Sequence, residues 1–218
     1  MDFRFDLVEQ YMPYFLRGTL ITIEFSILGI IFGTIVGLII GIGKMSENRV
    51  IRFPFVWYIN FFRGTPLFVQ ILLVHFAVIP TLTGKTNAFL ALVVALSINS
   101  GAYISEIFRA GIQSIDRGQM EAARSLGMTH RQAMRLVILP QAVKRMIPPL
   151  GNEFIVLIKD SSLGAVIAAP ELMYWGRAMQ GQYYRPWEPY LTVALIYFVL
   201  TLLLTYLVNY IERRVSTE

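Results

Sequence analysis

Five apolar blocks occupy most of the chain and leave little sequence for any other kind of structure. An α-helix needs about 20 apolar residues to cross the hydrocarbon layer of a membrane, and the blocks are of this order. We predict transmembrane helices at residues 19–43, 66–80, 88–108, 152–170 and 190–211. The whole chain, 1–218, then forms one all-α integral membrane domain of about five helices.

The composition argues against a soluble enzyme. Of the 218 residues, 56% are hydrophobic and 15% are charged, whereas soluble domains have about 45–50% and about 25%. The chain has no cysteine, which excludes disulfides, thiolate metal sites and cysteine nucleophiles. His75 and His130 are expected on opposite sides of the membrane, so they cannot share a metal ion. We therefore expect no catalytic residues, no metal site and no cofactor in this chain.

Basic residues predict how the chain is oriented. One set of alternate loops has twelve lysine and arginine residues, and the other set has five. Since basic loops stay in the cytoplasm, the N-terminus is expected outside and the C-terminus inside, with loop 109–148 in the cytoplasm. The same loops account for the net charge of +5, and we expect no nucleic-acid partner.

The first apolar block has a glycine at every fourth position, namely Gly29, Gly33, Gly37 and Gly41. This spacing places the glycines on one helix face, where another helix can approach closely. Whether that helix belongs to this chain or to a second one stays open.

Two proline-containing strings predict interruptions of helices. Residues 63–66 read Arg-Gly-Thr-Pro, so we expect an interfacial aromatic segment, a break and then the second span. Pro148 and Pro149 precede Gly151, which predicts a broken helix at the start of the fourth span.

The cytoplasmic loop is expected to form two short helices. Asp116 can cap the first helix, and Gly127 offers a left-handed stop after it. Thr129 and Gln132 have the spacing of a capping box, and the second helix is predicted to end at Leu139, before a proline. Such a rigid projection can dock into a groove of another protein, or it can lie on the membrane surface.

Several motifs in this order resemble one family. The string Glu-Ala-Ala-Arg-Ser-Leu-Gly at 121–127 resembles the cytoplasmic coupling motif of ABC-importer permease subunits. The strings at 63–67, 139–142, 148–154 and 159–163 resemble the polar amino-acid branch of that family. The ATPase-coupling residues that the resemblance implies are Glu121, Ala122, Ala123, Arg124, Leu126 and Gly127.

The resemblance also implies the partners of the chain. They are two ABC ATPase subunits, a second permease chain in a homo- or heterodimer, an extracytoplasmic solute-binding protein, an amino-acid substrate and the lipid of a bacterial cytoplasmic membrane. ATP and Mg²⁺ are expected on the ATPase. The string Gly-Lys-Thr at 84–86 resembles the end of a phosphate-binding loop. Such a loop needs a second glycine five residues before Gly84, but that position is Ile79, so we expect no nucleotide site here.

Ionisable residues inside an apolar bundle are costly, so they are candidate substrate ligands. Glu153 and Asp160 lie seven residues apart, on one helix face, and Asn99 and Ser100 offer neutral hydrogen bonds from the third span. We predict these four as the substrate site, with Asp160 alternatively pairing with a basic residue or capping a helix. Two carboxylates favour a basic substrate such as arginine, histidine or lysine.

The sequence thus predicts the permease subunit of an ATP-driven importer of polar L-amino acids, with a lean towards basic ones, working by alternating access. Alternatives are a permease for another small polar solute, a non-transporting membrane anchor for a cytosolic ATPase, and a channel subunit. A channel needs a continuous polar lining, whereas polar positions are scattered here.

Overall fold

The structure, a computed structural model, describes residues 2–216, and all the regular elements in that range are helical. This confirms the prediction of an all-α chain. The elements are α1 (Phe5–Lys44), α2 (Arg49–Gly64), α3 (Leu67–Leu73), η1 (Val74–Val78), α4 (Ile79–Thr83), α5 (Ala88–Gln113), α6 (Arg117–Ser125), α7 (His130–Ala133), η2 (Met134–Ile138), α8 (Leu139–Asp160), η3 (Ser161–Ile167), α9 (Leu172–Tyr183) and α10 (Trp187–Ser216).

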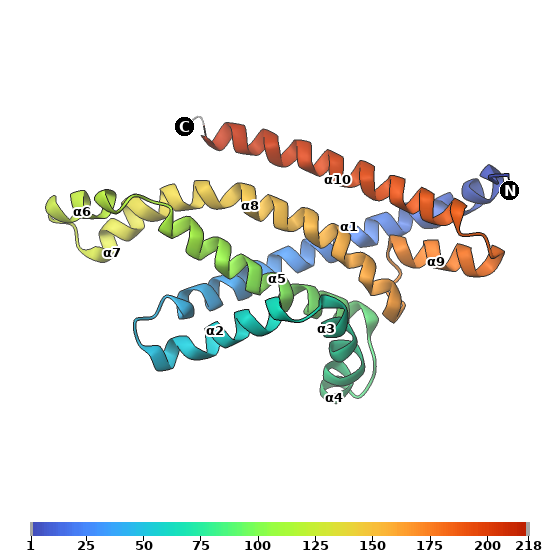
Figure 1. Ribbon diagram of the computed structural model, residues 1–218, viewed down its shortest axis with the longest axis horizontal. Helices are drawn as coiled ribbons and strands as arrows, with labels where there is room; N and C mark the ends of the chain where they lie inside the picture. Colours follow the sequence, from blue (N-terminus) through green and yellow to red (C-terminus); the bar gives the residue numbers. More distant parts are fainter. Residues whose placement is uncertain (1, 217–218) are drawn as a thin grey trace.

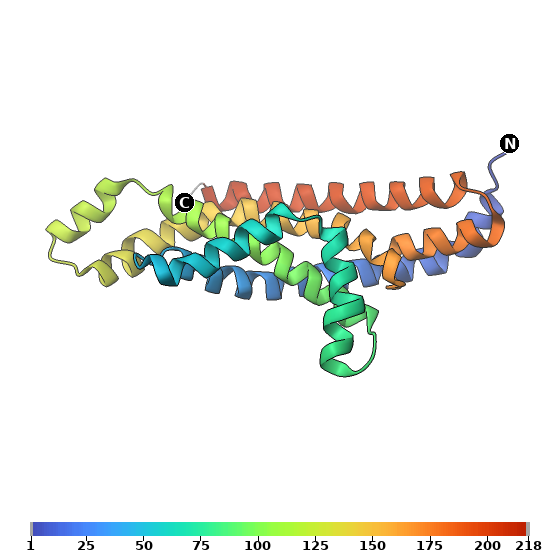
Figure 2. The same ribbon diagram turned by 60° about the horizontal axis from the view of Figure 1, so that its bottom comes forward.

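The helices form an elongated bundle with different elements at its two ends. Figure 1 shows α6 and α7 projecting from one end, while the N-terminus and α9 lie at the other. Helix α10 runs along one side of the bundle, and α3 and α4 project sideways from its middle (Figure 2). The bundle thus has two separate ends, connected by long helices.

Three helices are long and apolar enough to cross a membrane: α1, α5 and α10. They contain the first, third and fifth predicted spans. Helix α2 and the segment Leu67–Thr83 are long and apolar enough to cross a membrane only when they are taken together as one span. The two are bent by 106° at the Gly-Thr-Pro break. Helix α8, in the region of the fourth predicted span, does not meet this length and hydropathy criterion.

The glycine face of α1 packs against α5 of the same chain. A Cβ atom built on Gly37 would lie 2.8 Å from the Cβ of Ile104 and 3.0 Å from the carbonyl oxygen of Gly101. One built on Gly29 would lie 3.4 Å from the Cβ of Leu96. The partner helix that the sequence left open is therefore an internal one, and the glycines let the two backbones approach closely.

The main hydrophobic core lies where α1, α3, α5 and α8 meet. Phe25, Ile71, Leu92, Leu96 and Leu157 are among its buried side chains. This core fixes α8 against the tightly packed pair of α1 and α5, and so holds the face of α8 that bears Glu153 in a defined position.

Two of the prolines follow π-helical turns instead of ending a helix. The turn Val74–Val78 precedes Pro80, and the turn Met134–Ile138 precedes Pro140. A proline ring collides with the carbonyl four residues before it, and the wider π turn gives that carbonyl room. The prediction that the second cytoplasmic helix ends at Leu139 is therefore wrong, because the chain stays helical into α8.

The predicted break at Pro148 and Pro149 is also wrong. Helix α8 runs through both prolines from Leu139 to Asp160. Each proline removes one backbone donor, and close packing on both sides compensates for the loss. A Cβ on Gly151 would lie 2.7 Å from a methyl group of Val208 in α10, and α8 also packs against α5.

Candidate functional site

The projecting end of the bundle is a helical hairpin made of α6 and α7, here called the coupling hairpin (residues 117–133). The Asp116 carboxylate accepts a hydrogen bond from the amide of Gly118 at 2.7 Å and caps α6. Gly127 has φ of 85°, and Thr129 and Gln132 form a reciprocal capping box. These local features are as predicted, and they make the projection rigid.

The residues assigned to ATPase coupling divide into inward and outward groups. Ala123 is buried against the rest of the loop, whereas Glu121, Ala122 and Leu126 are exposed. Leu126 is 82% exposed at the end of α6, and Arg124 donates to the carbonyl of Met128 at 2.9 Å. The hairpin therefore presents an apolar side chain beside polar ones on a preformed support, which suits a docking surface.

A network of amide side chains secures the break between α2 and α3. Gln70 Nε2 donates to the carbonyl oxygens of Phe62 and Thr65, at 3.0 and 3.1 Å. Asn99 Nδ2 in turn donates to Gln70 Oε1 at 2.9 Å. Broken helices leave carbonyl groups without partners, and inside an apolar bundle such groups must be satisfied by side chains. Gln70 therefore stabilises the 106° bend.

Replacing Gln70 by alanine is expected to destabilise the protein by about 1–3 kcal/mol, because it leaves two part-buried carbonyl groups unpaired. The measurement is the thermal unfolding midpoint of the detergent-solubilised protein. Asn60→Ala is the control, since Asn60 is an exposed amide on α2. Equal midpoints for the two variants would contradict the role of Gln70.

A cavity of about 500 Å³ lies between the end of α2, the second half of α5 and the middle of α8. Its volume is within the range of small-ligand sites, about 300–1,000 Å³. The charged and aromatic side chains that line it are Arg63, Tyr103, Glu106, Arg145 and Glu153.

Two of the charged groups in this cavity are already engaged by the protein. Glu106 pairs with Lys44 and Arg109, and the Arg145 guanidinium donates to the carbonyl of Ser114. Within residues 2–216, Glu153 has no hydrogen-bond or ion-pair partner, and the Arg63 guanidinium lies over the ring of Tyr103, 5.2 Å from its centroid. One carboxylate and one guanidinium thus face the cavity with unused capacity to bind charged groups.

The structure separates the four predicted substrate ligands. Glu153 lines the cavity, while Asp160 lies on the same helix face, about 10 Å along the axis, and outside that lining. Asn99 donates to Gln70 of α3, and the Ser100 hydroxyl donates to the carbonyl of Gly29 in α1 at 3.3 Å. Both side chains therefore connect α5 to a neighbouring helix. Asp160, Asn99 and Ser100 do not line the cavity, and their role as substrate ligands stays a prediction.

Sequence reasoning missed Arg63 and Tyr103 as residues of the cavity. Arg63 was treated as part of a helix break and of a family motif, and Tyr103 has no motif around it. A charged residue directly before a Gly-Thr-Pro interruption was the available signal, because interrupted helices often mark binding sites in transport proteins.

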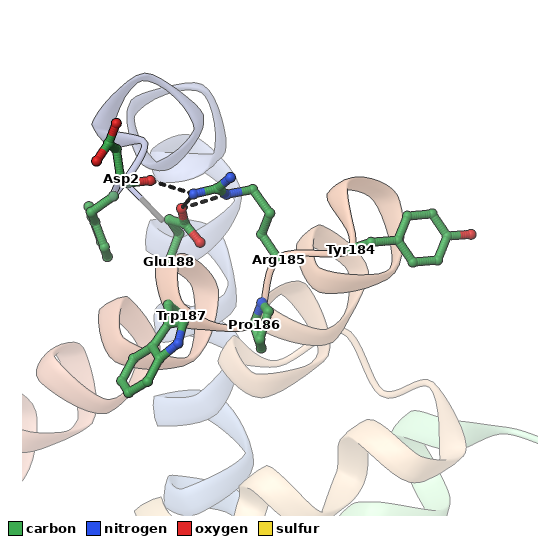
Figure 3. A pocket seen from close by; sticks show the side chains of 7 residues that line it. Asp2, Tyr184, Arg185, Pro186, Trp187 and Glu188 are labelled. Atoms are coloured by element: carbon green, nitrogen blue, oxygen red, sulfur yellow. Dashed lines mark hydrogen bonds and ion pairs between the residues drawn. The ribbon is translucent and has the colours of Figure 1, made fainter.

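A second pocket, of about 770 Å³, lies at the opposite end of the bundle from the coupling hairpin. Arg185 Nε donates to the carboxylate of Glu188 at 2.6 Å, and its terminal nitrogen donates to the carbonyl of Asp2. Figure 3 shows this cluster, with the side chains of Tyr184 and Trp187 directed away from it. Arg185 therefore connects the N-terminal segment to the start of α10, while the rings of Tyr184 and Trp187 stay exposed at this end.

Comparison with known proteins assigns the chain to a family. The sequence profile described as "Binding-protein-dependent transport system inner membrane component" matches residues 29–217. The "Arginine transport system permease protein ArtQ" of Bacillus subtilis (strain 168) is 38% identical over the full length of both chains. The "Glutamine transport system permease protein GlnP" of Escherichia coli (strain K12) is 36% identical over 99% of each.

A solved structure agrees in fold and sequence. It is described as an "amino acid ABC transporter with histidines" and shares 45% sequence identity with a TM-score of 0.92, covering 98% of this chain and 100% of that one. The similar chains are thus permease subunits of amino-acid transport systems, matched end to end. On this agreement of profile, sequence and fold, the chain belongs to the family of binding-protein-dependent transport system inner membrane components.

Proposed function

We propose that this chain is the translocation subunit of an ATP-driven importer of polar L-amino acids, of which a basic one would need Asp160 as a second carboxylate beside Glu153. The observation that supports this most directly is that Glu153 and Arg63 line the same cavity. Neither side chain has an ion-pair partner among the described residues. Each charged end of an amino acid needs an opposite charge in a dry site. Glu153 would bind an ammonium or guanidinium group of the substrate, and Arg63 its carboxylate.

The coupling mechanism follows from a continuous run of helix. Residues 130–160 are helical without interruption from the coupling hairpin to the cavity, through α7, η2 and α8. A displacement of the hairpin by an ATPase would therefore move Glu153 directly. In this proposal the ATPase subunits hold ATP and Mg²⁺, this chain holds no cofactor, and alternating access results from rigid movement of α8.

The proposed placement in the bacterial cytoplasmic membrane has five spans, with the bent pair of α2 and Leu67–Thr83 as the second and α8 as the fourth. The N-terminus lies outside, and the coupling hairpin and C-terminus lie inside, as the basic loops predict. The external pocket near Arg185 then faces the solute-binding protein, and a second permease chain completes the pathway. The relatives named for arginine and glutamine transport support an amino-acid substrate.

The test is ATP-dependent uptake of radiolabelled arginine into proteoliposomes that contain the assembled transporter. Glu153→Gln and Arg63→Gln are each expected to reduce uptake by about tenfold to about a hundredfold, through loss of a charge-assisted hydrogen bond. Asp160→Asn is expected to have an effect of the same sign.

Lys85→Gln serves as the control, because Lys85 lies exposed between α4 and α5, outside the cavity. Unchanged uptake in Glu153→Gln and Asp160→Asn together would refute the substrate site. If the unaltered protein binds its ATPase but takes up no amino acid, the chain is instead a membrane anchor. If it takes up a different small polar solute, the chain is a permease for that solute.

A further inference from the structure

A groove at the base of the bundle has a chemistry that the transport pathway does not use. It lies where the end of α1, the start of α2 and the end of α5 meet, and its volume is about 580 Å³. We call it the basic groove and define it by its three cationic and three apolar side chains: Lys44, Arg52, Arg109, Met45, Val56 and Ile112.

The basic groove has an excess of positive charge. Glu106 accepts a hydrogen bond from Lys44 and two from Arg109, at 3.0 and 2.9 Å, so one carboxylate faces two cations. The Arg52 guanidinium has no hydrogen-bond or ion-pair partner in the part of the chain that the structure describes. The groove thus has a fixed cationic wall and one guanidinium free to bind an anion.

The groove lies at the boundary of the apolar helices. The apolar blocks 19–43 and 88–108 end immediately before Lys44 and Arg109. On α2, Phe53 directly follows Arg52 and Trp57 lies about one turn further on, and the two side chains are 70% and 58% exposed. Aromatic side chains concentrate where the hydrocarbon layer meets the headgroups, so the basic groove is at headgroup depth.

The coupling hairpin extends past this level. In Figure 1, α6 and α7 project further along the bundle axis than the turn that joins α1 to α2. The hairpin tip and the basic groove are therefore separate surfaces at the same end of the bundle.

We infer that the basic groove binds the phosphate of an anionic phospholipid headgroup, with the acyl chains lying along the apolar surface of α2. Basic pockets between helices at the cytoplasmic face attract anionic lipids through their phosphates. Arg52 and Lys44 contact the headgroup, while Met45, Val56 and Ile112 contact its glycerol and upper acyl region. This inference rests on the proposed placement of the protein in a membrane, but not on the substrate site.

The test is native mass spectrometry of the transporter, purified together with its ATPase and titrated with phosphatidylglycerol or with zwitterionic phosphatidylcholine. Arg52→Gln is expected to weaken phosphatidylglycerol binding by about fivefold, the factor equivalent to about 1 kcal/mol for each basic residue near an anionic surface. Arg52→Lys should restore part of the binding. Arg49→Gln is the matched control, because Arg49 lies one turn earlier on the same helix and outside the groove.

Equal losses in Arg52→Gln and Arg49→Gln would overturn the inference, because general surface charge would then explain the binding. So would full displacement of the lipid by inorganic phosphate, which would identify a simple anion site. Loss of the ATPase from Arg52→Gln with unchanged lipid binding would identify a protein contact and also overturn it. Arginine uptake is measured separately, so failure of the lipid site is distinguishable from failure of the proposed transport.

Discussion

Replacing Gly37 by leucine is expected to abolish accumulation of the folded protein. Any side chain at this position must enter the contact between α1 and α5, where Ile104 Cβ and the carbonyl of Gly101 lie 2.8 and 3.0 Å from the site of a new Cβ. Overpacking typically costs about 1–3 kcal/mol, and contacts with a backbone atom and a β-branched side chain leave little room for relaxation. Fluorescence-detected size-exclusion chromatography measures the folded fraction directly.

A graded series makes this prediction specific. Gly37→Ala should lower the thermal midpoint, although alanine is the better helix former by about 1 kcal/mol. Gly181→Ala is the control, since a Cβ at Gly181 meets no atom within 4 Å among the described residues. Adding Ile104→Ala to Gly37→Ala should recover part of the loss, because the two sites share one contact. If Gly37→Ala and Gly181→Ala have the same midpoint, the proposed close packing is wrong.

Replacing Leu126 by aspartate is expected to detach the ATPase without unfolding the chain. Leu126 is 82% exposed at the end of α6, so its replacement leaves the permease itself intact. If the side chain fills an apolar groove of the ATPase, a carboxylate there weakens association by about thirtyfold or more, the equivalent of about 2 kcal/mol for an interface hot spot. Co-purification of the ATPase and arginine-stimulated ATP hydrolysis are the two measurements.

The matched control is Leu136→Asp, which makes the same change at an exposed leucine of the π turn that follows the hairpin. It should retain the ATPase. Equal loss in both variants would mean that the contact extends over the whole loop. Retention of the ATPase by Leu126→Asp would remove the coupling role from this residue.

The coupling hairpin could be predicted from sequence because its signals are local. Asp116, Gly127 and the Thr129–Gln132 pair each specify a helix end through contacts within a few residues. Such capping interactions do not depend on the rest of the fold. The three long apolar spans were predictable for a similar reason, since their length and hydropathy are properties of the segment itself.

The course of α8 could not be predicted in this way. Pro140, Pro148 and Pro149 each argue locally against a helix, and what keeps the helix intact is packing against α5 and α10 together with a π turn. Likewise, the partners of Asn99 and Ser100 lie on α3 and α1, far away in sequence. Polar residues within apolar spans were interpreted as substrate ligands because their distant protein partners cannot be identified from one sequence.

The π turn Met134–Ile138 sets the rotational offset between the coupling hairpin and α8. It contains one residue more than an α-helical turn would need, and each residue rotates an α-helix by about 100°. Deleting one residue from the turn would therefore restore a regular helix and, because the core holds α8, would turn the coupling hairpin about the helix axis by about 100°. Homologous chains that differ in length at this turn would present a different side of the hairpin at the end of the bundle, so the phase of the helix decides which hairpin side chains face outward.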